Sequence, residues 1–316
     1  MFWQREPVSS FDHPAPQAPR LAVSGNTASN RVQLAHALLC DGQYDAALAE
    51  LEVALADNPE SADGQLVKGL ALARKGNFRA AIRPLRTAIE FGTDPRIACF
   101  SLAAAYLRLE DFTGALALAD EMLQRDPQDA QAHCLSGEAL ARLGRPSDAL
   151  TAFERAADID PCLPAARLRL GELLVQREEW SRACQELALA VELTPTDMRA
   201  RQSLAQALHR SGRTAEAVQA CRAAIQCGVP SPELLLTMAE SCLAQGELFD
   251  AMAVLRMAML LAPSSIEAHR LMSRVLTEQG RGPEAQQYAA SAERLAAARD
   301  ARENKANMSG DKPNGS

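Results

Sequence analysis

The stretch that decides the fold is residues 130–163, which read AQAHCLSGEALARLGRPSDALTAFERAADIDPCL. Two apolar patterns of helix length lie on either side of Gly144-Arg145-Pro146. In the second pattern, Ala149, Phe153 and Ala156 recur at spacings of four and three, so they share one helical face. A pair of helices this short cannot bury its apolar face alone, which predicts that similar pairs stack against it.

The same pattern returns every 34 residues, with no insertion or deletion. Its clearest marker is an alanine in the second helix of each copy: Ala47, Ala81, Ala115, Ala149, Ala183, Ala217, Ala251 and Ala285. With this alanine as position 20, the copies span 28–61, 62–95, 96–129, 130–163, 164–197, 198–231, 232–265 and 266–299. Position 8 is always Ala, Gly or Ser, and position 27 is Ala except at Met122. Small residues at these positions let neighbouring helix backbones approach closely.

A 34-residue period with small residues at positions 8, 20 and 27 resembles the tetratricopeptide repeat family. The resemblance covers eight copies of 34 residues, or 272 of the 316 residues. It implies an all-α fold, a right-handed superhelical solenoid of eight helix-turn-helix repeats. Each repeat should have a first helix near positions 2–14 and a second near positions 18–31.

Two of the positions that depart from the family pattern concern the turn between the helices and the contact between repeats. The glycine between the helices, at position 15, is replaced by Glu110 and Glu178 in two copies. The large residue of position 4 is replaced mostly by polar ones: Arg31, Gln65, Cys99, His133, Arg167, Arg201, Leu235 and His269. The second departure predicts looser contacts between successive first helices.

We expect the solenoid to occupy residues 28–302. Length alone suggests two domains, but the unbroken period favours a single solenoid, which grows without a second core. The last copy continues into residues 291–299, which predicts one long final helix that caps the stack. Residues 303–316 are rich in Lys, Asn, Gly and Ser, which is typical of a disordered tail.

Residues 1–27 contain four prolines and little periodicity, which predicts a disordered or extended arm. Phe2, Trp3 and Phe11 are apolar side chains that a solvated tail does not need. They leave open a second interpretation, in which the arm folds back and occupies the protein's own groove.

The composition excludes several classes of function. A net charge of −7 argues against nucleic-acid binding, which needs a basic surface. The eight cysteines occupy different repeat positions without a C-x-x-C motif, which favours reduced and mostly buried thiols over a metal site or disulfides. No stretch is apolar and long enough to span a bilayer, and the first residues lack a signal peptide's apolar core, so we expect a cytoplasmic protein. No catalytic, metal or cofactor motif occurs with supporting context, so we expect neither an enzyme nor a cofactor.

The resemblance implies that first helices line a concave groove through positions 2, 5, 6, 9, 12 and 13. In the first three copies these positions are mostly apolar, with Val32, Leu66, Val67, Leu70, Ile97, Phe100 and Leu107. In copies four to six they are polar. The residues that we predict to bind a peptide are Leu66, Leu70, Phe100, Arg108, Glu138, Arg142, Arg169, Gln202, Gln206 and Arg210. A matching partner would present an apolar anchor and, beyond it, a polar or acidic stretch.

Arginine recurs at position 13, in Arg74, Arg108, Arg142 and Arg210. These arginines could read carboxylates along an extended peptide. A basic residue near the end of a helix also complements the helix dipole, and this second interpretation is favoured.

Some relatives hold the C-terminal carboxylate of heat-shock chaperones with a clamp of Lys, Asn and Arg. No three successive copies here carry that set, because Cys134 and Glu138 stand where the clamp needs Lys and Asn. A co-chaperone of this kind is therefore disfavoured.

The predicted function is protein–protein interaction, as an adaptor or assembly scaffold that holds a peptide or helix in the concave groove. The alternative is a regulatory or accessory subunit of an enzyme, envelope or secretion complex, bound through its convex surface or edges. Neither the partner nor the oligomeric state follows from the sequence.

Overall fold

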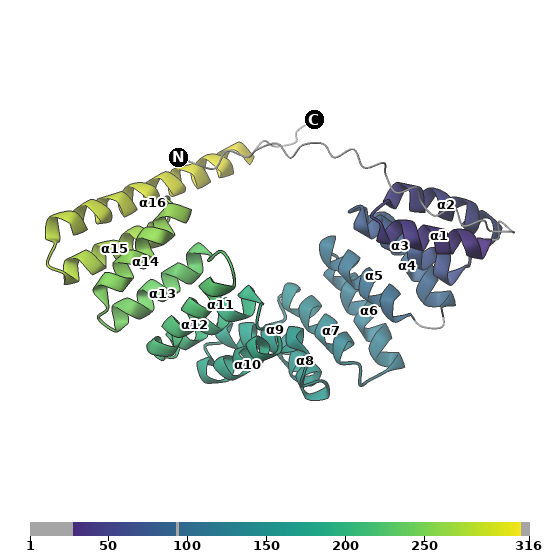
Figure 1. Ribbon diagram of the computed structural model, residues 1–316, viewed down its shortest axis with the longest axis horizontal. Coiled ribbons are helices and arrows are strands. Elements are labelled where there is room, and N and C mark those ends of the chain that lie inside the picture. Colours follow the sequence, from purple (N-terminus) through teal and green to yellow (C-terminus); the bar gives the residue numbers. More distant parts are fainter. Residues whose placement is uncertain (1–27, 93–94, 311–316) are drawn as a thin grey trace, which may run out of the picture. The chain divides into compact units, whose positions relative to one another are not determined.

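The computed structural model describes residues 28–92 and 95–310, with side chains as far as residue 302. The predicted arm, residues 1–27, lies outside the described residues. Every regular element in the described ranges is an α-helix (Figure 1). None of these helices combines the length and the apolar character that crossing a membrane requires.

The chain divides into two compact units between Asp111 and Phe112, inside the third predicted repeat. The first unit contains α1 (Ala28–Cys40), α2 (Tyr44–Asp57), α3 (Ala62–Arg74), α4 (Phe78–Phe91) and α5 (Arg96–Arg108). The second unit contains α6 (Phe112–Arg125), α7 (Ala130–Arg142), α8 (Pro146–Ile159), α9 (Pro164–Gln176), α10 (Trp180–Leu193), α11 (Met198–Arg210), α12 (Thr214–Cys227), α13 (Pro232–Ala244), α14 (Leu248–Leu261), α15 (Ile266–Glu278) and α16 (Gly282–Gly310). The single solenoid over residues 28–302 that the sequence favours stays a prediction.

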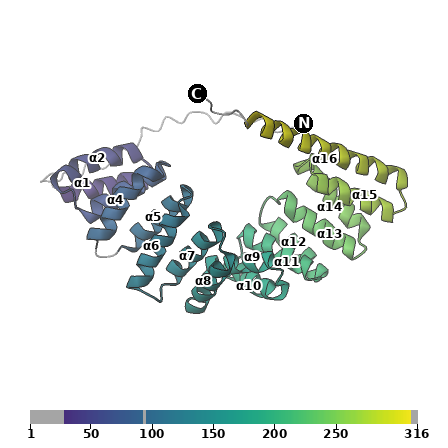
Figure 2. The ribbon, with the colours of Figure 1, turned by 180° about the vertical axis from the view of Figure 1, so that it is seen from behind.

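Within each unit, consecutive helices form antiparallel pairs that stack in chain order (Figures 1 and 2). In the first unit, α1 pairs with α2 and α3 with α4, and the first helices α1, α3 and α5 are neighbours. In the second unit the pairs run from α7–α8 to α15–α16, and α7, α9, α11, α13 and α15 are neighbours in turn. The fold is the predicted all-α solenoid of tandem helix pairs.

The helix bounds follow the 34-residue period closely. First helices span repeat positions 1–13 and second helices span positions 17–30, except for α16. The predicted bounds were one residue later at both ends, which is within the usual spread for helix termini. The marker alanines are the centre of the core: each of the eight is at most 4% exposed.

The turn between the two helices of a repeat needs a left-handed residue. The glycines at position 15 have φ of 75–82°, and Glu110 and Glu178, which replace glycine, have φ of 58° and 61°. A side chain with a Cβ atom is strained in this region by about 1–2 kcal/mol. The two glutamates therefore adopt the conformation of the glycine that they replace.

The last helix is longer than predicted. α16 runs to Gly310, so residues 303–310, which we expected in the disordered tail, are helical. The stretch reads ENKANMSG, and four of its first six residues, Glu303, Lys305, Ala306 and Met308, are strong helix formers that favour continuation of the helix. Residues 311–316 lie outside the described residues.

Candidate protein-interaction surfaces

The apolar part of the predicted groove lies in the first unit. Leu66 and Leu70 are half-buried on α3, Phe100 is 37% exposed on α5, and Arg108 is exposed at the end of α5. Val67, which the sequence also assigned to the groove, is only 4% exposed, because it belongs to the core between α1, α2 and α3. The first unit thus presents most, but not all, of the predicted apolar side chains.

A pocket opens where α3 and α5 begin and α4 ends. Its lining residues are Ser61, Ala62, Asp63, Leu66, Ala88, Phe91, Gly92, Ile97 and Ala98. Ile97 is 59% exposed and Phe91 is 46% exposed, although both are large apolar side chains. Phe91 was not predicted from the sequence, because it lies on a second helix and only first helices were expected to line the groove. The first unit therefore exposes two large apolar side chains in one pocket.

The polar part of the predicted groove lies in the second unit. Glu138 and Arg142 lie on α7, Arg169 lies on α9, and Gln202, Gln206 and Arg210 lie on α11. Arg142, Gln206 and Arg210 are at least partly exposed, and the other three are half-buried.

Ion pairs link the successive first helices of this surface. Arg169 Nε lies 2.9 Å from Glu138 Oε2, and Arg169 Nη1 lies 3.2 Å from Glu172 Oε2. Arg199, at the start of α11, donates to both carboxylate oxygens of Glu172, at 2.6 and 2.8 Å. Such a bidentate pair fixes geometry as well as charge. Arg169 and Glu138 therefore neutralise each other's charge in part.

Hydrogen bonds continue the link from α11 to α13. Ser231 Oγ, at the start of α13, donates to Gln202 Oε1 at 3.1 Å. His209 Nδ1 lies 2.9 Å from Ser241 Oγ, and His209 Nε2 lies 3.2 Å from Glu240 Oε2. The hydrogen bond from His209 holds the pKa of Glu240 below its ordinary value. The polar surface is thus held together from α7 to α13 by its own side chains.

Two of the four arginines at position 13 lie over aromatic rings. The Arg142 guanidinium carbon is 4.8 Å from the centre of the Phe112 ring, and that of Arg108 is 5.6 Å from the centre of the Phe78 ring. In both cases the ring is at position 17 of the preceding repeat. Cation–π contacts of this kind contribute about 0.5–1 kcal/mol at exposed sites. Neither interpretation of these arginines from the sequence included an aromatic partner.

The sequence does contain a signal for this pairing. Position 17 is aromatic in four repeats, at Tyr44, Phe78, Phe112 and Trp180. Position 13 of the following repeat is Arg in each of these four cases, at Arg74, Arg108, Arg142 and Arg210, and in no other repeat. A comparison of positions between neighbouring repeats would therefore have found the pair.

Comparisons with known proteins agree with this architecture. The family sequence model described as "Cilia and flagella-associated protein 70 C-terminal domain" matches residues 113–308, and the one described as "Tetratricopeptide repeat" matches residues 32–95. The chain belongs to the tetratricopeptide repeat family. None of the curated proteins matches the sequence.

Two solved structures show the same fold. A tetratricopeptide repeat protein from Parabacteroides merdae is 17% identical, with a TM-score of 0.56 over 80% of this chain and 100% of that chain. A chain of the APC/C hetero-tetramer Cut9–Hcn1 is 15% identical, with a TM-score of 0.53 over 86% of this chain and 54% of that chain. Tetratricopeptide repeat proteins bind protein partners, so the fold itself is that of a protein-interaction scaffold.

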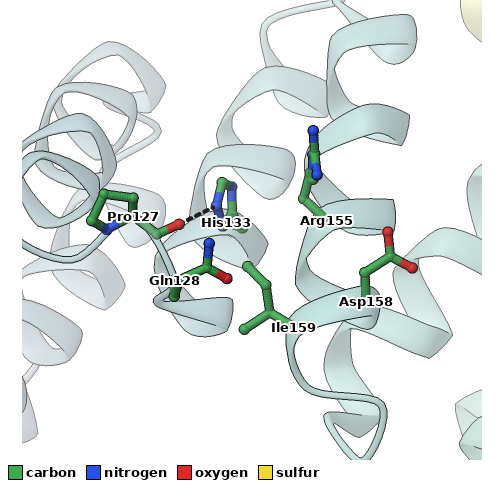
Figure 3. A pocket seen from close by; sticks show the side chains of 6 residues that line it. All are labelled: Pro127, Gln128, His133, Arg155, Asp158 and Ile159. Atoms are coloured by element: carbon green, nitrogen blue, oxygen red, sulfur yellow. Dashed lines mark hydrogen bonds between the residues drawn. The ribbon is translucent and has the colours of Figure 1, made fainter.

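Four of the polar residues at position 4 of these tetratricopeptide repeats form hydrogen bonds to the preceding repeat. Gln65, His133, Arg167 and Arg201 each donate to the carbonyl of a proline in the preceding turn, at 2.6–3.3 Å. Figure 3 shows one of them, His133, whose ring points to the Pro127 carbonyl. The structure thus gives position 4 a role at the repeat junction in place of the large apolar contact.

The pocket beside His133 is polar and contains none of the predicted groove residues. It is lined by Pro127, Gln128, His133, Arg155, Asp158 and Ile159, from the α6–α7 turn, α7 and α8 (Figure 3). Its lining has none of the exposed large apolar side chains found in the first unit's pocket, so it is a weaker candidate.

The cysteines are mostly shielded from solvent. Cys99, Cys184, Cys221 and Cys242 are buried, Cys134 is half-buried, and Cys40, Cys162 and Cys227 are exposed. Burial raises the pKa of Cys221 to about 12 and the pKa values of Cys134 and Cys242 to about 11. Within the described residues, no three His, Cys, Asp or Glu side chains are grouped as a metal site would require.

Proposed function

We propose that this protein is an adaptor or assembly scaffold that binds a peptide or helix of a partner protein along its first helices. The single observation that carries the proposal is the exposure of Phe91 and Ile97 in one pocket of the first unit, with Phe100 one helical turn further along α5. Large apolar side chains grouped at a surface favour burial against a partner.

The chemistry of the pocket defines the part of the partner that enters it. Leu66, Ala88, Phe91 and Ile97 offer aliphatic and aromatic surface, and Asp63 is the one charged side chain among the described residues of the lining. An aliphatic or aromatic side chain of the partner fits this lining, since each buried CH₂ contributes about 0.8 kcal/mol. A basic residue next to that anchor would complement Asp63.

In the second unit, Arg142, Gln206 and Arg210 are the groups that we infer meet a partner. Glu138, Arg169 and Gln202 act mainly by holding α7, α9, α11 and α13 in place. Glu138 and Arg169 form an ion pair between α7 and α9, and Gln202 accepts a hydrogen bond from Ser231 at the start of α13. Pre-organised polar groups lower the entropy that binding costs. A protein partner is favoured over nucleic acid because the net charge of −7 repels phosphate.

A library of random peptides displayed on phage and selected against the full chain tests the proposal. The selected peptides should share an apolar anchor. The variant Phe91→Ser with Ile97→Ser should bind them at least about tenfold more weakly, which corresponds to about 1.4 kcal/mol. The matched control is Val53→Ser, because Val53 is 47% exposed in the same unit and does not line the pocket.

Two results would count against groove binding. One is a library that yields no binder, and the other is an equal loss of affinity in the pocket variant and in Val53→Ser. Either result would favour the alternative, an accessory subunit that is held through its convex surface.

A further inference from the structure

Helix α14 carries an apolar stripe on its exposed side. The stripe consists of Phe249, Ala253, Met257 and Leu260, at spacings of four, four and three, so these residues share one face of the helix. Phe249 is 78% exposed, Leu260 is 81% exposed and Met257 is 45% exposed. The opposite side of α14 packs in the core through Ala251, Val254, Leu255 and Ala258. A stripe of large apolar residues along a helix is normally buried.

The other repeats serve as internal controls for this stripe. In α8 the same four repeat positions are Ser147, Thr151, Arg155 and Asp158. At the position of Leu260 the other repeats have Ala56, Glu90, Gln124, Asp158, Glu192, Gln226 and Arg294. The fold therefore does not need apolar residues at these positions, and α14 differs for a reason outside the core.

We propose that the α14 stripe is a self-association surface, on which α14 of a second copy of this chain packs antiparallel about a two-fold axis through Ala253. Symmetric pairing requires that a surface complement itself. Such a contact differs from the peptide groove and does not depend on it.

The residues of α14 satisfy this requirement of self-complementarity. A two-fold axis at Ala253 brings Phe249 level with Met257 of the second copy, so a large ring lies beside a flexible apolar chain. At the axis, Ala253 faces its own copy, and a small residue there allows a close helix approach.

The charges of α14 follow the same symmetry. Asp250 and Arg256 are the only charged residues of the helix, both are exposed, and each is three positions from Ala253. The axis therefore brings Asp250 of each copy level with Arg256 of the other, within reach of the long arginine side chain. In the single chain, Asp250 is 3.4 Å from Arg222 on α12, an exposed pair that contributes little. Two opposite pairs of charges would fix the antiparallel direction.

Sedimentation equilibrium of the full chain over a roughly hundredfold range of concentration tests the proposal, since association follows mass action. The mass should rise from 34.0 kDa toward twice that value. The test variant combines Met257→Arg with Leu260→Asp, which installs the residues that α8 has at these two repeat positions. It should raise the dimer dissociation constant at least about tenfold. The control is Leu189→Arg, because Leu189 is 39% exposed at the same repeat position as Met257, on α10.

A charge exchange tests the geometry. Each single exchange, Asp250→Arg or Arg256→Asp, gives residues 250 and 256 the same charge. Both contacts between residue 250 of one copy and residue 256 of the other then become repulsive, so each single exchange should weaken the dimer. The double exchange, Asp250→Arg with Arg256→Asp, restores both pairs and should recover most of the affinity.

Three results would overturn the proposal. The chain could stay monomeric at every concentration, which would also be the result if a different protein covers the stripe. The control Leu189→Arg could weaken the dimer as much as the stripe variant does. The double charge exchange could fail to restore the dimer affinity that each single exchange lowers.

Discussion

The ring of Phe153 fills the space where a side chain of Gly137 would lie. A Cβ atom on Gly137 would be 2.8 Å from Cε1 of Phe153 and 2.9 Å from Cδ1 and Cζ. The same relation holds between Gly171 and Leu187, where the nearest atom would be 2.5 Å away. Distances under 3.0 Å require a shift of the neighbour. Position 8 is therefore small because the second helix of the same repeat inserts a large side chain against it.

Replacing Gly137 by Ala should destabilise the second unit by roughly 1–3 kcal/mol, the usual effect of overpacking. The higher helix propensity of Ala offsets about 1 kcal/mol of this at most. Ala is tolerated opposite Leu in another repeat, since Ala239 and Leu255 occupy the corresponding positions. The penalty should therefore be smaller in a Phe153→Leu background. Chemical denaturation of the four proteins of this double-mutant cycle measures the coupling. Stabilisation by Gly137→Ala alone would contradict the packing argument.

Replacing Glu178 by Gly should stabilise the protein by up to about 1 kcal/mol. Glu178 has φ of 61° in the turn between α9 and α10, where Gly has no steric cost. The greater freedom of Gly in the unfolded chain reduces the gain. The control is Gln185→Gly, at an exposed position inside α10, which should cost about 1 kcal/mol. Thermal unfolding of the two variants should therefore shift in opposite directions, and a loss of stability in both would contradict the prediction.

Much of the fold could be predicted because its determinants are local and repeated. The alanines from Ala47 to Ala285 mark the core, and the helix bounds agree to within one residue except at the end of α16. Each repeat buries its small residues against its own partner helix and against the next pair. Eight copies of the same constraint leave little freedom for the architecture.

The candidate surfaces could be predicted only in part, because they depend on contacts between helices of different repeats. The family resemblance assigns repeat positions to the groove, but it does not specify which side chains the residues at these positions contact. Arg169 bridges Glu138 and Glu172, and Phe91 reaches the pocket from a second helix. Side-chain reach and direction decide such contacts, and a repeat position alone does not specify them.

The cysteines should react with alkylating reagents in two classes. At about pH 8, iodoacetamide should modify Cys40, Cys162 and Cys227 rapidly, since these thiols are exposed. With its pKa raised to about 11, half-buried Cys134 has only about one thiolate in a thousand at that pH. Peptide mass spectrometry identifies the modified residues, and unfolding in guanidinium should make all eight reactive. Labelling of Cys134 as fast as that of Cys162 would contradict the assignment.

The same burial predicts how stability depends on alkaline pH. The pKa of Cys221 is raised from its ordinary value of 9.0 to about 12, so the unfolded chain loses this proton first as the pH rises. The stability that the protonated Cys221 thiol contributes to the folded chain is complete below pH 9.0 and is lost as the pH rises toward about 12. The variant Cys221→Ala should show a smaller loss of stability over this range, measured by chemical denaturation at each pH. An equal loss in the variant and the parent chain would contradict the prediction.

Substitutions at the contact between Arg142 and Phe112 can distinguish a structural role of the position-13 arginines from a role in binding. Arg142→Ala and Phe112→Leu should each lower the free energy of unfolding of the full chain, and the two effects should overlap by about 0.5–1 kcal/mol in a double-mutant cycle. An effect on the helix dipole alone would predict no coupling to Phe112, because the charge at the end of α7 is unchanged by that substitution.

Binding of an acidic peptide by the same variants completes the test. If Arg142 also meets carboxylates of a partner, Phe112→Leu should keep most of the affinity, because the guanidinium remains at the end of α7. Replacing Arg108 and Arg142 together by Ala should then weaken the peptide and lower the salt dependence of its binding. Gln176→Ala is the control, because Gln176 occupies position 13 in a repeat without a preceding aromatic residue. If the effects of Arg142→Ala and Phe112→Leu on the free energy of unfolding are additive, the contact has no structural role. If the variant with Arg108 and Arg142 both replaced by Ala binds the peptide unchanged, these arginines have no role in recognition.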